Sequence, residues 1–124
     1  MSEGKAKHYR WDDVTREQLS PAIARRMIST DRVTLVQFNL EGGAHVAEHV
    51  HPNEQVTYIV EGQLRFHLGE DGSEVVDVKA GEVLHIPPDL PHSADVVETT
   101  FAIDVFAPRR EDWLAGEDAY LRGD

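Results

Sequence analysis

Hydrophobic and polar residues alternate in short runs over most of the chain, which is the pattern of half-buried β-strands. Breaks rich in glycine, proline and acidic residues separate the runs, as turns between strands require. Regular spacing of this kind favours an all-β sandwich or barrel. The expected strands cover residues 23–29, 33–40, 55–60, 63–68, 75–78, 83–86, 93–97 and 100–106.

The two ends of the chain do not follow the strand pattern. Residues 1–10 are polar, and we expect them to form a flexible segment. Acidic and hydroxyl residues after Trp11 predict a short helical turn over residues 11–19, ended by Ser20 and Pro21. Residues 109–121 are compatible with a helix whose apolar residues pack on the outside of the strands. These apolar residues are Trp113, Leu114 and Tyr120.

Length and composition predict one domain over residues 11–124. At 124 residues and 13.9 kDa the chain can close a single barrel around a side-chain core. Twenty-three acidic residues against twelve basic ones give a formal charge of −11. A surface with this charge repels phosphate backbones and anionic lipid headgroups, so nucleic acids and membranes are poor partners.

The absence of cysteine narrows the chemistry of any metal site. Without cysteine there is no thiolate ligand and no thiol nucleophile, which leaves imidazole, carboxylate and amide groups. The N-terminal residues have no apolar signal core, and no stretch is long enough to span a bilayer. We therefore expect a cytoplasmic protein.

The most informative stretch is a pair of histidines followed by a glutamine. On a strand, residues two and four apart share a face, so His49, His51 and Gln55 would point inward together. Glu54 has the opposite parity and is expected to face away. A bulge near residues 52–53 would exchange the positions of Glu54 and Gln55.

His92 lies about forty residues further along and can join the other donors only if the sheet closes on itself. Three imidazoles and an amide oxygen would hold one divalent transition metal, with zinc, nickel, iron, manganese, cobalt and copper all possible. The other histidines are expected to be surface or hydrogen-bonded residues. They are His8, His45, His67 and His85.

These motifs resemble those of the cupin superfamily over residues 33–106, the expected barrel core. The first cupin motif, G(X)5HXH(X)3,4E(X)6G, is matched with Gln in place of the usual Glu. The second, G(X)5PXG(X)2H(X)3N, is matched with Asp89 in place of the last Gly and Val96 in place of Asn. The matching residues are Gly43, His49, His51, Gln55 and Gly62, then Gly81, Pro87 and His92. The resemblance implies a jelly-roll β-barrel with short helical segments at both ends, but it does not fix a function.

A neutral amide in place of the carboxylate would leave the metal site with a formal charge of about +2 instead of +1. Such a site favours non-redox chemistry on a carbonyl, a hydroxyl or a developing enolate. The segments HPNEQVTYIVEG and FAIDVFAPRREDWL resemble KdgF-type cupins, which convert 4,5-unsaturated uronates from pectin or alginate breakdown into linear keto sugars. That family's ligand set corresponds to His49, His51, Gln55 and His92.

The KdgF resemblance also implies roles for residues at the end of the last strand. The essential acid of that family corresponds to Asp104, its neighbouring aromatic residue to Phe106, and its arginine to Arg110, with Arg109 as the rival for substrate binding. Asp104 would move a proton during enol–keto conversion and ring opening. Arg110 would hold the carboxylate of an anionic sugar with a two-pronged pair of hydrogen bonds.

Other functions remain open at the level of sequence. One alternative is an iron-dependent dioxygenase or a lyase acting on another small molecule, and another is a cupin that binds a sugar or other small ligand without catalysis. The resemblance also implies a homodimer, in which residues 23–29 would form an edge or exchanged strand.

Overall fold

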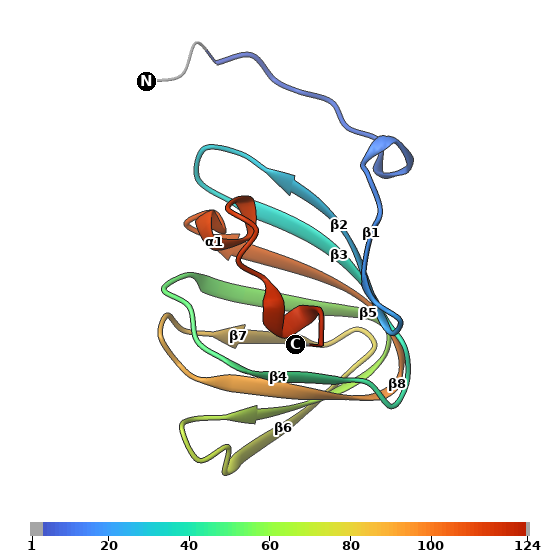
Figure 1. Ribbon diagram of the computed structural model, residues 1–124, viewed down its shortest axis with the longest axis vertical. Coiled ribbons are helices and arrows are strands. Elements are labelled where there is room, and N and C mark those ends of the chain that lie inside the picture. The colour runs from blue at the N-terminus through green and yellow to red at the C-terminus, as the bar shows by residue number, and fades with distance from the viewer. Residues whose placement is uncertain (1–3, 124) are drawn as a thin grey trace.

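The computed structural model describes residues 4–123, and its strands form one continuous antiparallel array closed into a barrel (Figure 1). The expected flexible segment, residues 1–10, therefore lies partly outside the described residues. The strands run in the order β1-β2-β3-β8-β5-β6, while β4 pairs with β8 and β7 pairs with β5. Their bounds are β1 Glu17–Ser20, β2 Ile23–Ser29, β3 Thr34–Leu40, β4 His45–His49, β5 Glu54–Leu68, β6 Glu74–Lys79, β7 Val83–Ile86 and β8 His92–Ala107.

The two longest strands, β5 and β8, hold the two sides of the barrel together. The first part of β5 pairs with the end of β8 and with β7, and the second part pairs with the start of β8 and with β6. The sequence predicted two separate strands in each of these regions, and in the first a turn signal at residues 61–62 lies between them. In the structure each interruption is a bend with a shifted register inside one strand.

Gly62 shows why the bend in β5 needs its residue type. Its φ is +96°, and a β-carbon there would collide with the Thr99 carbonyl and with Thr100. The Thr100 hydroxyl instead accepts a hydrogen bond from the backbone N–H of Gln63 at 3.1 Å and donates one to the Glu98 carbonyl at 2.7 Å. The two bends therefore pack directly against each other.

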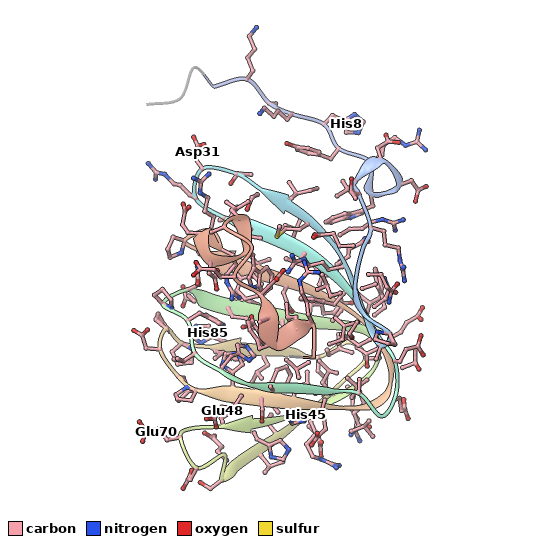
Figure 2. The ribbon with its side chains drawn as sticks, viewed as in Figure 1. His8, Asp31, His45, Glu48, Glu70 and His85 are labelled. Atoms are coloured by element: carbon pink, nitrogen blue, oxygen red, sulfur yellow. The ribbon has the colours of Figure 1, made fainter. Side chains whose placement is uncertain are left out.

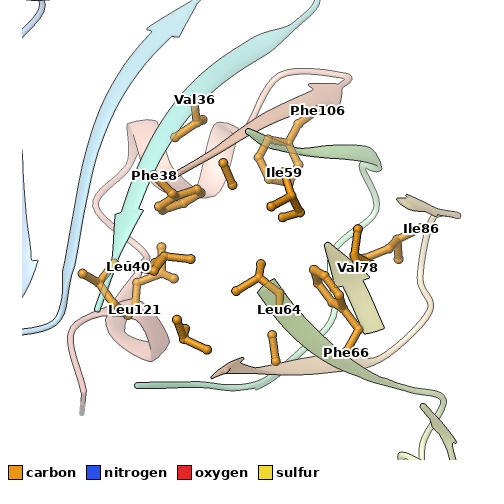
Figure 3. Close-up of a cluster of buried hydrophobic side chains, with 14 of the residues drawn as sticks. Val36, Phe38, Leu40, Ile59, Leu64, Phe66, Val78, Ile86, Phe106 and Leu121 are labelled. Carbon is orange, nitrogen blue, oxygen red and sulfur yellow. The ribbon is translucent and has the colours of Figure 1, made fainter. Parts of the chain in front are cut away.

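The barrel interior is apolar at one end and polar at the other. The apolar part consists of inward side chains from both sides of the barrel, several of them completely buried (Figure 3). It includes Val36, Phe38, Leu40, Ile59, Leu64, Phe66, Val78, Ile86, Phe106 and Leu121. Burial of these side chains supplies the main driving force for folding.

Three short helical segments flank the strands: η1 Trp11–Asp13, α1 Glu111–Leu114 and η2 Ala119–Leu121. The expected helical turn over residues 11–19 is thus wrong in its second half, because residues 17–20 pair with β2 as strand β1. β2 accordingly lies between β1 and β3, so residues 23–29 are not an edge strand. In residues 4–123 no helix has the length and hydropathy needed to cross a membrane.

The C-terminal segment lies across the barrel in Figure 1, and it packs inward where the sequence predicted outward packing. The Trp113 ring meets Phe106 and Phe38 edge to face, with ring centroids 5.1 and 6.0 Å away. Two guanidinium groups lie over this ring, Arg110 at 3.9 Å and Arg25 at 4.8 Å from the ring centroid. This prediction failed because helical periodicity gives the apolar face of a segment but not the surface that the face will meet.

Candidate metal centre and active-site cavity

The three histidines expected to bind metal come together at the polar end of the barrel. His49 ends β4, directly opposite His92 at the start of β8, and His51 lies in the connection from β4 to β5. Their potential ligand atoms all lie within 4.8 Å of one another. The chain leaves the strand after His49, so the alternation argument does not hold continuously through His51. The barrel closure brings the three rings together nonetheless.

Hydrogen bonds fix the same ring nitrogen in each histidine. The Nδ1 atoms of His49, His51 and His92 lie 2.7, 3.1 and 2.8 Å from the backbone carbonyls of residues 47, 53 and 90. A carbonyl only accepts, so each Nδ1 carries the hydrogen and each neutral ring presents a bare lone pair on Nε2. The Nε2 of His92 is buried without a hydrogen-bond partner. These rings are therefore oriented as metal-ligating histidines are.

Burial keeps the three rings neutral. Desolvation, together with the neighbouring His92, lowers the pKa of His49 to about 3. Desolvation and the charge of Arg110 lower the pKa of His51 to about 4, and burial also lowers the pKa of His92. At neutral pH all three imidazoles therefore have lone pairs available for a cation.

Gln55 completes this group of donors. It is the second residue of β5, it is buried, and it pairs across the sheet with Phe106. Its Nε2 donates to the Thr57 hydroxyl at 2.9 Å, which leaves its Oε1 facing the Nε2 of His51 at 3.1 Å. Two lone pairs facing each other repel, and a cation bound by both atoms would replace that repulsion with attraction.

The donor set therefore fits a single divalent metal ion, and His49, His51 and His92 form its core. Glu54 faces away, as its parity predicted: it is exposed and pairs with His85 on the outer surface at 2.7 Å. His45 and His85 lie on the outside of the barrel in Figure 2, and His45 and His67 both pair with Asp95. The expectation that these histidines are surface or hydrogen-bonded residues is confirmed.

A cavity of about 60 Å³ adjoins the histidines inside the barrel. His49, Gln55 and His92 line it together with Asp104, Phe106 and Arg110. The C-terminal segment adds Trp113 and Tyr120 to its wall. Most of the wall is aromatic or aliphatic, so the few polar groups within it stand in a poorly hydrated environment.

Asp104 is the acidic group of this cavity. It lies on β8 opposite Thr57 and Val36, it is 7% exposed, and its Oδ1 has no hydrogen-bond partner. Burial raises the pKa of Asp104 to about 7, while a hydrogen bond with Thr57 and the charge of Arg110 oppose the rise. The carboxyl group can thus hold or release a proton near neutral pH.

The structure separates the two candidate arginines. Arg110 is buried, lines the cavity and lies 4.7 Å over the Phe106 ring. Its Nε and Nη2 already bind the Asp112 carboxylate at 2.9 and 2.8 Å, so the expected two-pronged pair is made within the protein. Its Nη1 is buried without a partner. Arg109 does not line the cavity, and its side chain pairs with exposed Glu111 at 2.6 Å.

Sequence reasoning missed Trp113 and Tyr120 as wall residues of the cavity. The Tyr120 ring stacks on His49 with centroids 4.2 Å apart and planes 21° apart. The only available signal was a pair of aromatic residues in a segment rich in acidic residues, which does not distinguish a cavity wall from an outer packing face.

Comparison with known proteins agrees with this geometry. The family model described as "Cupin domain" matches residues 36–106. The structure of KdgF from Halomonas sp. is 26% identical, with a TM-score of 0.77 over 86% of this chain and 99% of that one. An RmlC-like cupin from Shewanella frigidimarina NCIMB 400 is 29% identical, with a TM-score of 0.74 over 87% of this chain and 96% of that one.

Curated relatives include 3-hydroxyanthranilate 3,4-dioxygenase from Bacillus cereus (strain ATCC 10987 / NRS 248), which is 28% identical over 106 residues. That alignment covers 82% of this chain and 58% of the relative. The chain thus spans a little over half the length of the curated relatives that it matches.

Proposed function

This chain belongs to the cupin family, and on that premise we propose that it is a metal-dependent, non-redox enzyme that converts 4,5-unsaturated uronates into linear keto sugars. The observation that carries the proposal is Asp104, a buried carboxyl group with a raised pKa in the same cavity as the histidine cluster. Similarity to KdgF supports the choice of substrate.

The proposed metal ligands are His49, His51, Gln55 and His92. A bound divalent cation would supply Lewis-acid polarisation of a substrate oxygen, and the neutral amide of Gln55 leaves its charge less compensated than a carboxylate would. Gln55 also donates to Thr57, which in turn has a hydrogen bond with Asp104. Thr57 therefore links the proposed ligand Gln55 to the acid Asp104 through two hydrogen bonds.

Ketonisation of an enol removes a proton from oxygen and adds a proton to carbon, with no net loss or gain. Asp104 is the group that we propose for this transfer, because a pKa near neutrality allows it both to accept and to donate. Phe106, which is 2% exposed, keeps water away from the carboxyl group. We propose that Arg110, which lines the cavity, meets the substrate carboxylate with Nη1, its one unpaired nitrogen, in preference to Arg109, which does not line it.

The decisive experiment follows the ultraviolet absorbance of the conjugated enol carboxylate in unsaturated galacturonate and its alginate-derived analogue. Native protein, protein stripped of metal, and the Asp104→Ala variant are compared, with Asp77→Ala as a control because Asp77 is exposed and pairs with Arg65 outside the cavity. Decay that requires both metal and Asp104, but not Asp77, supports the proposal. No acceleration on either sugar by metal-loaded protein refutes it.

A dioxygenase is the second candidate, since the curated relatives are named 3-hydroxyanthranilate 3,4-dioxygenases. It predicts oxygen uptake by iron-loaded protein supplied with 3-hydroxyanthranilate. An anaerobic assay separates the two, because uronate ketonisation needs no oxygen. A non-catalytic sugar-binding cupin would instead bind ligand while Asp104→Ala left every activity unchanged.

We also propose a homodimer, supported by an apolar patch on the outside of the barrel. The patch consists of Val56, Tyr58, Val83 and Val105, between 37 and 60% exposed, and cross-strand pairing places Val56 beside Val105 and Tyr58 beside Val83. Light scattering should give a molar mass twice that of one chain, and the Val56→Lys variant should have the mass of a single chain. The cytoplasmic location expected from the sequence stays a prediction.

A further inference from the structure

Tyr120 occupies an unusual position for a residue outside the strands. Its ring lies flat on His49, and it lines the cavity that Asp104 and Gln55 also line. It comes from η2, which lies beyond residues 36–106, the part that matches the family model.

The hydrogen bonds of the Tyr120 hydroxyl leave its proton without an acceptor. The oxygen lies 3.0 Å from Nη2 of Arg110 and 3.2 Å from Nε1 of Trp113. Both of those nitrogens can only donate, so the hydroxyl accepts twice and both of its lone pairs are used. Within residues 4–123 the hydroxyl makes no hydrogen bonds besides these two. Its O–H is therefore free to donate to a bound molecule.

The hydroxyl also stays protonated and fixed in place. A phenol is protonated at neutral pH, so the Tyr120 hydroxyl has a proton to donate. The two donors that bind it are themselves held: Arg110 by Asp112, and Trp113 by contacts of its ring with the guanidinium groups of Arg110 and Arg25. A donor fixed in this way loses little entropy on binding a ligand.

Arg110, which binds this hydroxyl, also has a guanidinium nitrogen without a partner. Its Nη2 binds the hydroxyl of Tyr120, while its buried Nη1 has no partner. The cavity thus has two unused donors on adjacent groups, one charged and one neutral. A carboxylate, with two oxygens and about four lone pairs, is the ligand group that both donors suit.

We propose that Tyr120 is a substrate-binding residue that donates its hydroxyl proton to the substrate carboxylate held by Arg110. This inference rests on the proposed uronate function and names a second donor for the anionic end of that substrate. It makes the C-terminal segment, through η2 and Trp113, part of the specificity for acids over neutral sugars.

The test uses Tyr120→Phe in metal-loaded protein, because this change removes one oxygen and keeps the ring on His49. Tyr9→Phe is the matched control, because Tyr9 is exposed and does not line the cavity. One arm measures KM and kcat on unsaturated galacturonate. The other measures, by calorimetry, the binding of saturated galacturonate and of its neutral methyl ester. Binding of the ester reports whether the variant still has an intact cavity.

In Tyr120→Phe we expect KM and the dissociation constant of galacturonate to rise at least about tenfold, since a hydrogen bond to a charged group is lost. Ester binding and kcat should change less than about threefold, and Tyr9→Phe should match the native protein. Unchanged galacturonate affinity in Tyr120→Phe overturns the inference. If native protein still turns over the unsaturated sugar in that case, the proposed function stands. Binding that depends on Tyr120 without turnover refutes only the proposed reaction, and native protein that neither binds nor turns over refutes both.

Discussion

Replacing Asp104 with asparagine should remove one pH-dependent contribution to the stability of the metal-free protein. The carboxyl group is buried with Oδ1 unpaired, and its pKa rises from 3.8 in the unfolded chain to about 7 in the folded protein. The folded state thus binds this proton more tightly than the unfolded state does. The contribution of Asp104 to stability should therefore fall as the pH rises from about 4 to about 7, the reverse of a salt-bridged carboxylate and opposite in sign to the buried histidines.

The size of the effect follows from the two pKa values. Ionisation of Asp104 should cost roughly 4 kcal/mol at pH 8 and roughly 2 kcal/mol at pH 5, so the two conditions differ by 2 to 3 kcal/mol. Asparagine does not titrate, and its altered hydrogen bonding costs the same at both pH values. The difference between the pH values therefore isolates the ionisation of Asp104.

Urea unfolding with a chelator present, followed by tryptophan fluorescence at pH 5 and pH 8, measures this difference. The free energy of unfolding of Asp104→Asn minus that of native protein should be larger by about 2 to 3 kcal/mol at pH 8 than at pH 5. Asp77→Asn controls for the loss of one negative charge from an acidic protein. A pH-dependent difference below about 1 kcal/mol, or of opposite sign, would refute the burial argument for Asp104.

Three further changes test other parts of the structure. Gln55→Glu should bind divalent metal about tenfold more tightly and slow turnover by a similar factor, because a carboxylate neutralises one charge of the cation; chelator competition and steady-state rates measure both, and an unchanged rate would contradict the role given to the amide. Gly62→Ala should lower the free energy of unfolding by more than about 2 kcal/mol, as measured by urea unfolding. Gly43→Ala is the control, because Gly43 also has a positive φ, +91°, but has open space around it, and it should cost about 1 kcal/mol. Equal costs for the two variants would argue against the close packing of the bend at Gly62. His92→Ala should abolish the rise in melting temperature on adding divalent metal, while His85→Ala on the outer surface should retain it.

Much of the fold was predictable because strands reveal themselves locally. Alternation and turn residues gave β2 and β7 with their correct bounds and most of β3 and β6. They failed at Gly62, where a turn signal proved to be a bend within β5, and at residues 17–20, where strand pairing outweighed a local preference for a helical turn. Strand β4 was absent from the expected strands, since only its pairing with β8 distinguishes it from a loop.

For the candidate site, residue chemistry and the two-residue period of a strand were enough to predict the donor types, the inward direction of Gln55 and the outward direction of Glu54. The pairing of Arg110 with Asp112 and the absence of Arg109 from the cavity wall could be seen only in the folded structure. Only the tertiary structure also placed Tyr120 on His49. These contacts join residues whose spacing obeys no local period, so they depend on how the barrel closes and where the C-terminal segment packs.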